Sequence, residues 1–236
     1  MKKQILILFC TVLFLIMLLQ CLPVQDTAII PAASPEENCV MALTFDDGPS
    51  PIYTPPLLEG LKERNIRATF FLLGKQAEEQ PALVQAIAAE GHQIGNHTYS
   101  HVFLNQMNRE DAAEEVRRGE LTLESILGRS GYWIRPPYGA ADPELLEKLS
   151  APVICWSVDP RDWECRDTDA IVTHILENAS DGDIILLHDS YPTSVEAALQ
   201  TVDRLQARGV EFLTVEQLLT RRGIQISPGR LYRNAQ

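Results

Sequence analysis

Two adjacent carboxylates, Asp46 and Asp47, stand in the sequence TFDDGP (44–49), at the end of a short apolar run. The run predicts a buried strand, and the Gly-Pro pair ends it. Because neighbouring side chains on an extended segment point in opposite directions, one carboxylate can bind a metal ion while the other accepts a proton. Asp, Gly and Pro are also ordinary turn residues, so the segment alone fits a simple bend equally well. The choice between these interpretations depends on the rest of the chain.

Two histidines, His97 and His101, are four residues apart in HTYSH (97–101). If this segment forms a helical turn, both imidazoles share a face and can bind one metal ion. Together with one carboxylate they make a donor set with open positions, as in hydrolytic zinc sites. Such an ion polarises a carbonyl oxygen and activates water, and a second carboxylate can accept the water's proton. The alternative is a pair of unrelated surface histidines.

Three further segments place polar residues after apolar runs. Arg135 begins RPPYG (135–139), a stiff loop that can hold a guanidinium against a carboxylate. His188 ends LLH (186–188) and can protonate a leaving group if a carboxylate holds its other ring nitrogen. DPRDW (159–163) can supply that carboxylate. Each segment also has a plainer interpretation: a solvated arginine in a turn, a capped histidine at a strand end, and a loop acid beside a half-buried aromatic residue.

Short apolar runs alternate with longer amphipathic ones from Cys39 onward, which predicts an α/β fold with a parallel sheet or a (β/α) barrel. Strands are predicted at 40–45, 68–73, 93–96, 132–135, 153–158, 183–188 and 211–213. Helices are predicted at 55–64, 81–90, 109–127, 143–149, 168–178, 194–207 and 215–222. Ligand sites in parallel α/β folds lie beyond the carboxyl ends of the strands. The polar residues above stand at those ends, so we expect them to meet at one rim.

The first 21 residues have a different character from the rest of the chain. Two lysines precede an apolar stretch from 5 to 19, which indicates a cleaved secretory signal or an uncleaved signal anchor. Lipidation of Cys21 is a third alternative. Residues 22–38, with several prolines and acidic residues, are expected to be a linker. We therefore expect an exported protein that is extracellular, anchored to the membrane through its N-terminal segment, or associated with the cell wall.

The net charge narrows the classes of molecule that the domain can bind. The formal net charge is −12, and it becomes −14 without the two lysines of the leader. A domain with this charge is not expected to bind nucleic acid or anionic lipid through bulk electrostatics.

Cys39, Cys155 and Cys165 follow the leader without metal-site spacing. Cys155 and Cys165 either pair in an oxidising compartment or remain buried thiols. We expect a monomer.

The five segments, taken in order, resemble the five motifs of the polysaccharide deacetylases of carbohydrate esterase family 4. The resemblance covers about residues 39–222, and no motif residue departs from the family pattern. It implies a catalytic domain with a distorted (β/α)7 barrel at 39–222, followed by a C-terminal tail at 223–236. It also implies metal-dependent hydrolysis of the N-acetyl groups of a polysaccharide.

The first three motifs of the family imply the metal site and the base. The resemblance makes Asp46 the catalytic base and Asp47 a metal ligand, together with His97 and His101. It makes Arg135 the residue that orients the base. Zinc suits two imidazoles and a carboxylate, but cobalt or another divalent ion fits the same donors.

The remaining roles also come from the resemblance. The backbone N–H of Tyr138 is implied to bind the oxyanion, and His188 to be the general acid. Asp162 is implied to tune that histidine, while Trp163 lines the substrate pocket. Leu186 is implied to form part of the pocket for the acetyl methyl group.

The leader and the resemblance together indicate a substrate outside the cytoplasmic membrane. We expect N-acetylglucosamine units of peptidoglycan, with N-acetylmuramic acid, chitin oligomers, poly-N-acetylglucosamine and acetylxylan as alternatives. A rival of another class is a non-catalytic glycan-binding domain that has kept the barrel. Such a protein would be expected to lack at least one of the acidic or histidine residues, and all are present. A hydrolase of a non-sugar amide is the other rival, and the complete set of motifs argues against it.

Overall fold

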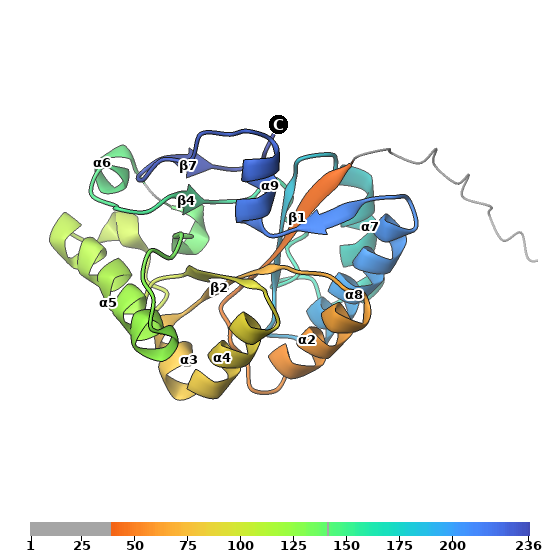
Figure 1. Ribbon diagram of the computed structural model, residues 1–236, viewed down its shortest axis with the longest axis horizontal. Helices are drawn as coiled ribbons and strands as arrows, with labels where there is room; N and C mark the ends of the chain where they lie inside the picture. The colour runs from red at the N-terminus through yellow and green to blue at the C-terminus, as the bar shows by residue number, and fades with distance from the viewer. Residues whose placement is uncertain (1–38, 141) are drawn as a thin grey trace, which may run out of the picture. The chain divides into compact units, whose positions relative to one another are not determined.

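The computed structural model of the chain describes residues 39–140 and 142–236 (Figure 1). The expected signal or anchor at 1–21, including Cys21, and the expected linker at 22–38 lie outside the described residues. In the described part of the chain, no helix combines the length and the apolar character needed to cross a membrane.

The strand β1 (Val40–Asp46) is the centre of the fold, and all seven of its residues are buried. β5 (Ile184–His188) pairs with it in parallel along one edge. β6 (Glu211–Leu213) pairs with the first half of β1, and β2 (Thr69–Leu72) pairs with its second half, also in parallel. β3 (Gln93–Asn96) extends the sheet beyond β2. A parallel strand covered on both faces requires a continuous apolar sequence, which the run before the two carboxylates provides.

Single bridges complete the ring of strands on its other side. Ile134 bridges Asn96 at the end of β3 and also Val153 at the start of β4 (Val153–Ile154), and Val158 bridges Ile185 in β5. All three bridges are parallel. The segments therefore close into a barrel that is regular around β1 and irregular on the opposite side.

Helices pack around the outside of these strands (Figure 1). They are α2 (Thr54–Glu63), α3 (Gly74–Glu79), α4 (Pro81–Ala89), α5 (Arg109–Leu127), α6 (Pro143–Leu146), α7 (Thr168–Asn178), α8 (Pro192–Gln206) and α9 (Val215–Arg221), with short 3-10 turns η1 (Leu104–Gln106) and η2 (Pro137–Gly139). The side chain of Asn108 caps the first turn of α5, and Gly128 ends this helix with a left-handed φ of 67°. The main apolar cluster joins β1, β2 and β5 to α2, α4, α7 and α8, so it fixes the strand ends that carry the polar residues.

Several predicted elements differ from the observed ones. The strand predicted at 153–158 is shortened to β4, the helix predicted at 143–149 is shortened to α6, and α3 was not predicted. The strand predicted at 132–135 is reduced to the single bridge residue Ile134, because two prolines follow Arg135 and turn the chain into η2. The segment at 223–236, which we expected to be a tail, packs on the domain. Its strand β7 (Leu231–Tyr232) pairs with β4, and the Ala235 amide donates to the carbonyl of Gly182 at 2.8 Å. A two-residue strand is too short to produce a recognisable sequence pattern.

Candidate active site

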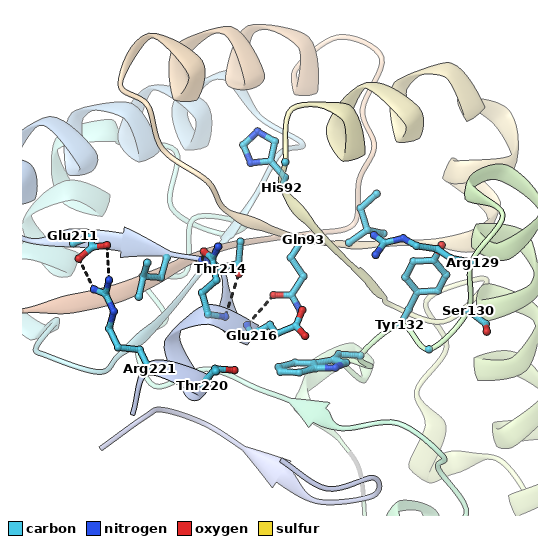
Figure 2. A pocket seen from close by; sticks show the side chains of 16 residues that line it. His92, Gln93, Arg129, Ser130, Tyr132, Glu211, Thr214, Glu216, Thr220 and Arg221 are labelled. Atoms are coloured by element: carbon cyan, nitrogen blue, oxygen red, sulfur yellow. Dashed lines mark hydrogen bonds and ion pairs between the residues drawn. The ribbon is translucent and has the colours of Figure 1, made fainter. Parts of the chain in front are cut away.

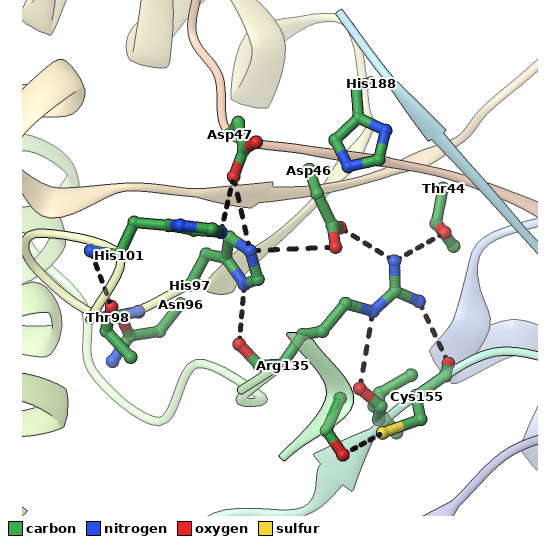
Figure 3. Close-up of polar contacts among 12 residues, drawn as sticks. Thr44, Asp46, Asp47, Asn96, His97, Thr98, His101, Arg135, Cys155 and His188 are labelled. Atoms are coloured by element: carbon green, nitrogen blue, oxygen red, sulfur yellow. Dashed lines mark hydrogen bonds and ion pairs between the residues drawn. The ribbon is translucent and has the colours of Figure 1, made fainter. Parts of the chain in front are cut away.

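The carboxyl ends of the barrel strands bring the predicted polar residues together. In the parallel register of β1 and β5, Asp46 lies opposite His188. β3 ends at Asn96, directly before His97. Figure 3 shows Asp46 between His97 and Arg135, with Asp47 and His188 above it. The rim predicted from the alternation of strands and helices is therefore present.

Asp47, His97 and His101 form a three-residue cluster on this rim. Nε2 of His97 lies 3.4 Å from Oδ1 of Asp47, and Nε2 of His101 lies 3.2 Å from the same oxygen. The three candidate ligand atoms all lie within 4.8 Å of one another. Asp47 Oδ1 is buried and has no hydrogen-bond partner among the described residues. A buried carboxylate oxygen without a donor, facing two imidazole nitrogens, fits a divalent metal ion.

Backbone contacts hold His97 in the orientation that a metal site requires. Its Nδ1 lies 2.6 Å from the carbonyl oxygen of Arg135, so the Nδ1–H donates there and Nε2 faces Asp47. The segment 97–101 is not a helical turn, because Thr98 and His101 have positive φ values of 70° and 60°. The two histidines thus meet through a tight loop rather than through the i, i+4 spacing of a helix.

Strained backbone is concentrated at the same rim. Six residues other than glycine have positive φ in the described part of the chain, and five of them lie in the candidate site segments. These five are Asp47, Thr98, His101, Tyr138 and Arg161. Each such residue costs on the order of 1–3 kcal/mol and persists only where its surroundings hold it in place. This distribution is typical of a functional site.

Arg135 fixes one oxygen of Asp46 and leaves the other facing the cluster. The Arg135 side chain is fully buried, and its Nη1 donates to Oδ1 of Asp46 at 2.7 Å. Its other nitrogens donate to the carbonyl oxygens of Ile154 and Cys155 at 3.3 and 3.0 Å. Oδ2 of Asp46 lies 3.7 Å from Nε2 of His97. Asp46 therefore has one oxygen available at the cluster.

His188 forms a second buried pair, with Asp162. Nδ1 of His188 donates to Oδ1 of Asp162 at 2.8 Å, while the His188 amide donates to Oδ2 at 2.8 Å. Burial lowers the pKa of His188, but the hydrogen bond and charge of Asp162, with the charges of Asp46 and Asp47, raise this pKa to about 9. His188 is therefore a proton donor at neutral pH.

The carboxylates and imidazoles of the cluster also shift one another's pKa. Burial raises the pKa of Asp47, but the contact with His97 and the charges of His97, His101 and His188 bring it down to about 2. Burial lowers the pKa of His97, yet the charge of Asp46 and the contact with Asp47 raise it overall. Burial lowers the pKa of His101. A bound ion would therefore compete mainly with a proton on His97.

Comparison with known proteins identifies the family. The sequence matches the family described as "Polysaccharide deacetylase" over residues 33–151. Chitooligosaccharide deacetylase of Azorhizobium caulinodans is 39% identical over 191 residues, which cover 79% of this chain and 90% of the relative. The chain belongs to the polysaccharide deacetylase family. Peptidoglycan-N-acetylglucosamine deacetylase PgdA of Listeria monocytogenes is 36% identical over 198 residues, 83% of this chain, and the match spans only 41% of PgdA.

The fold of this polysaccharide deacetylase is also that of solved family members. The family 4 acetyl xylan esterase of Clostridium thermocellum, solved in complex with a cobalt ion, superimposes with a TM-score of 0.78 at 28% identity. The match covers 83% of this chain and 98% of the esterase. The expectation of a distorted (β/α)7 barrel is thereby confirmed.

Three further predicted residues lie at or near the rim of the deacetylase domain. Tyr138 is 60% exposed and lies in η2, in the loop that follows Arg135. Trp163 is 43% exposed, beside the buried Asp162. Leu186 is buried in β5, two residues before His188, and therefore on the same face of the strand.

Sequence reasoning missed two groups that support the site. Oδ1 of Asn96 accepts from the Thr98 amide at 2.9 Å and so holds the loop that carries both histidines. Asp189 is fully buried behind Gly48, and the hydroxyl of Thr54 donates to it. The sequence offered one signal for Asp189: it directly follows His188, so on an extended strand its side chain points to the opposite side from the His188 ring.

Cys155 and Cys165 are free thiols, and only Cys155 is buried. The disulfide considered from the sequence is therefore not formed between them.

A separate cavity of about 840 Å³ lies at the start of β3, whereas the candidate site lies beyond its end (Figure 2). None of the predicted site residues lines it. Gln93 Oε1 accepts from the amide of Glu216 at 2.9 Å, and Arg221 pairs with Glu211. Much of its polar lining is thus already bonded, and we place the chemistry at the rim in Figure 3.

Proposed function

We propose that this protein is a metal-dependent hydrolase that removes N-acetyl groups from N-acetylglucosamine units of a polysaccharide, in particular peptidoglycan. The observation that carries the proposal is the arrangement around the Asp47–His97–His101 cluster. A buried carboxylate with one free oxygen, Asp46, and a protonated histidine, His188, lie opposite each other beside that cluster. This arrangement supplies a base, an acid and a metal site within one rim.

The cluster has the donor set of a hydrolytic metal site. A divalent ion held by Asp47, His97 and His101 would polarise the acetyl carbonyl and make water a better nucleophile. We propose zinc for two imidazoles and a carboxylate, with cobalt as the alternative. The C. thermocellum relative was solved with cobalt, which supports a site open to more than one ion.

The protein's own residues would move the protons. Oδ2 of Asp46 accepts a proton from the attacking water, while Arg135 keeps Oδ1 in place. As the water oxygen bonds to the acetyl carbon, the backbone N–H of Tyr138 donates to the carbonyl oxygen, where negative charge develops. His188 then donates a proton to the sugar nitrogen as the C–N bond breaks. The products are acetate and a free amine on the sugar, and Leu186 supplies apolar surface for the acetyl methyl group.

The substrate and location are part of the same proposal. The name of the Listeria relative, which is longer than this chain, specifies N-acetylglucosamine in peptidoglycan, and that of the Azorhizobium relative specifies chitooligosaccharides. We propose that the N-terminal segment exports the domain and that it acts on the cell wall, as a monomer, either released or held at the membrane.

Acetate release tests the proposal directly. Purified protein is incubated with peptidoglycan, chitopentaose and acetylxylan, before and after chelation and with zinc or cobalt added back, and products are followed by mass spectrometry. We expect the largest release from peptidoglycan and loss of release after chelation. Asp46→Asn should abolish release while zinc still binds, whereas Asp169→Asn, an exposed acid on α7, should change neither. Acetate release that persists in fully chelated enzyme, or metal-loaded Asp46→Asn with full activity, would overturn the proposal.

A further inference from the structure

Exposed apolar side chains gather around the candidate active site. Five large apolar residues are strongly exposed in the part of the chain that the structure describes: Ile52, Phe103, Leu121, Tyr138 and Trp163. All except Leu121, which is on α5, lie in loops that follow barrel strands at the rim. Exposed apolar surface that collects around a site, rather than being scattered, marks a place where a ligand binds. The ligand must therefore present apolar faces beyond the reacting acetyl group.

Two of these residues are in contact with each other and with the metal cluster. The rings of Phe103 and Tyr138 have centroids 5.4 Å apart at an angle of 34°. Tyr138 in turn lies edge-on to His101, with centroids 4.8 Å apart. We name the Phe103–Tyr138 ring pair the aromatic platform. Because it touches a candidate metal ligand directly, anything lying on it is next to the reacting group.

The aromatic platform is held in place from below. Leu104, next to Phe103, is completely buried in an apolar cluster with Val116 and Ile134, which fixes the loop and leaves Phe103 facing outward at 37% exposure. Tyr138 has the left-handed backbone with φ of 61°, and its ring lies edge-on to His101 while remaining 60% exposed. Two fixed rings that remain exposed lose little conformational freedom when a ligand covers them.

We propose that the aromatic platform is a sugar-binding subsite, which stacks against the N-acetylhexosamine next to the one being deacetylated. A pyranose ring has an apolar face of C–H groups and a polar rim, so it matches an exposed aromatic pair better than a charged peptide or a nucleic acid does. The inference rests on the proposed function, because it takes the reacting sugar to lie at the cluster. It makes Phe103 a residue that favours chains over single sugars.

Kinetics on long and short substrates test the subsite. For Phe103→Ala we expect KM on chitopentaose to rise about five- to tenfold, the size of one aromatic stacking contact, with kcat within about twofold of wild type. Hydrolysis of an aryl acetate, which has no sugar, should be unchanged. Phe103→Trp keeps a ring face and should retain the low KM. Leu121→Ala removes an apolar side chain of α5 that is 45% exposed, away from the rim, and should change nothing.

The results separate this inference from the proposed function. Equal losses of Phe103→Ala on chitopentaose and aryl acetate, or a KM on chitopentaose no different from that of Leu121→Ala, would overturn the subsite while leaving the deacetylase intact. If the wild-type protein releases no acetate from any glycan, the proposed function fails instead. Calorimetric binding of chitopentaose then decides the subsite: weaker binding by Phe103→Ala supports it, and equal binding overturns it.

Discussion

Replacing Gly48 by alanine should force a collision with the buried carboxyl group of Asp189. A Cβ at position 48 would lie 2.6 Å from Oδ2 and 2.7 Å from Oδ1 of Asp189. The carboxyl group cannot move into solvent, because it is completely buried and the hydroxyl of Thr54 donates to it. The alternative is a shift of the turn, which also carries Asp47. The substitution should therefore affect both stability and metal binding.

The size of the effect follows from the distances. Ordinary contacts of a Cβ begin at about 3.4 Å, so a 2.6 Å approach requires a movement of about 0.8 Å. Overpacking of this kind costs about 1–3 kcal/mol of unfolding free energy. Displacing a residue beside a metal ligand typically weakens metal binding by about tenfold or more. We expect both effects in Gly48→Ala.

A double-mutant cycle with Asp189→Ala isolates the collision. Removing the carboxyl group makes room for the new methyl group, so Gly48→Ala should cost about 1–3 kcal/mol less in the Asp189→Ala background than in wild type. Denaturant unfolding gives the free energies, and competition with a fluorescent chelator gives the zinc affinity. Zinc affinity of the double variant should exceed that of Gly48→Ala.

Gly60→Ala provides a matched control. Its Cβ would lie 2.4 Å from the side chain of Leu199, far from the cluster in sequence and in structure. It should leave zinc affinity unchanged, and its effect on unfolding free energy should add independently to that of Asp189→Ala. If the costs of Gly48→Ala and Asp189→Ala also simply add, the carboxyl group does not limit position 48 and the reasoning is wrong.

Three other predictions concern the charged groups of the site. Asp162→Asn removes the partner that raises the pKa of His188, so this pKa should fall from about 9 by about 1 unit or more. NMR titration of the metal-free protein measures this pKa. An unchanged value would contradict the role given to Asp162. Arg135→Met leaves the Asp46 carboxylate buried without its partner, so the unfolding free energy should drop by about 3–5 kcal/mol and acetate release should be lost. Unfolding in urea measures the stability, and a variant as stable as wild type would refute the role given to this ion pair. The pKa of His97 is raised, and a histidine must be neutral to bind a metal ion, so zinc affinity should increase with pH until His97 is deprotonated. Calorimetry measures the affinity, and an affinity that does not change with pH would contradict this prediction.

The general position of the site was predictable from the sequence because it follows from topology. Parallel strands end on one side of the barrel, so polar residues placed after apolar runs had to approach one another. Asp46 and His188 meet because β1 and β5 are neighbours in register. The helix ends at Asn108 and Gly128 were also predictable, since each depends on a local interaction that one residue type provides.

The remaining features depend on tertiary contacts that leave little trace in local sequence. The segment before Arg135 has strand-forming residues, but only Ile134 forms a bridge to neighbouring strands. The meeting of His97 and His101 uses a left-handed backbone at His101, which an L-residue adopts only when surrounding contacts hold it. Asp189 contacts Gly48 over a large sequence separation, so neither residue predicts the other.

The pairing of β7 with β4 has a consequence for how the protein is made. The last strand supplies partners for β4, and the amide of Ala235 bonds to Gly182 in the turn before β5. While a ribosome or a translocation channel still holds residues 231–235, the irregular side of the barrel lacks one of its strands. Cotranslational folding can therefore assemble the half around β1, β2 and β3, but the barrel is completed only once residues 231–235 have emerged and reached β4. A stalled or truncated chain would expose the edge of β4, and chaperones or proteases would be expected to recognise it.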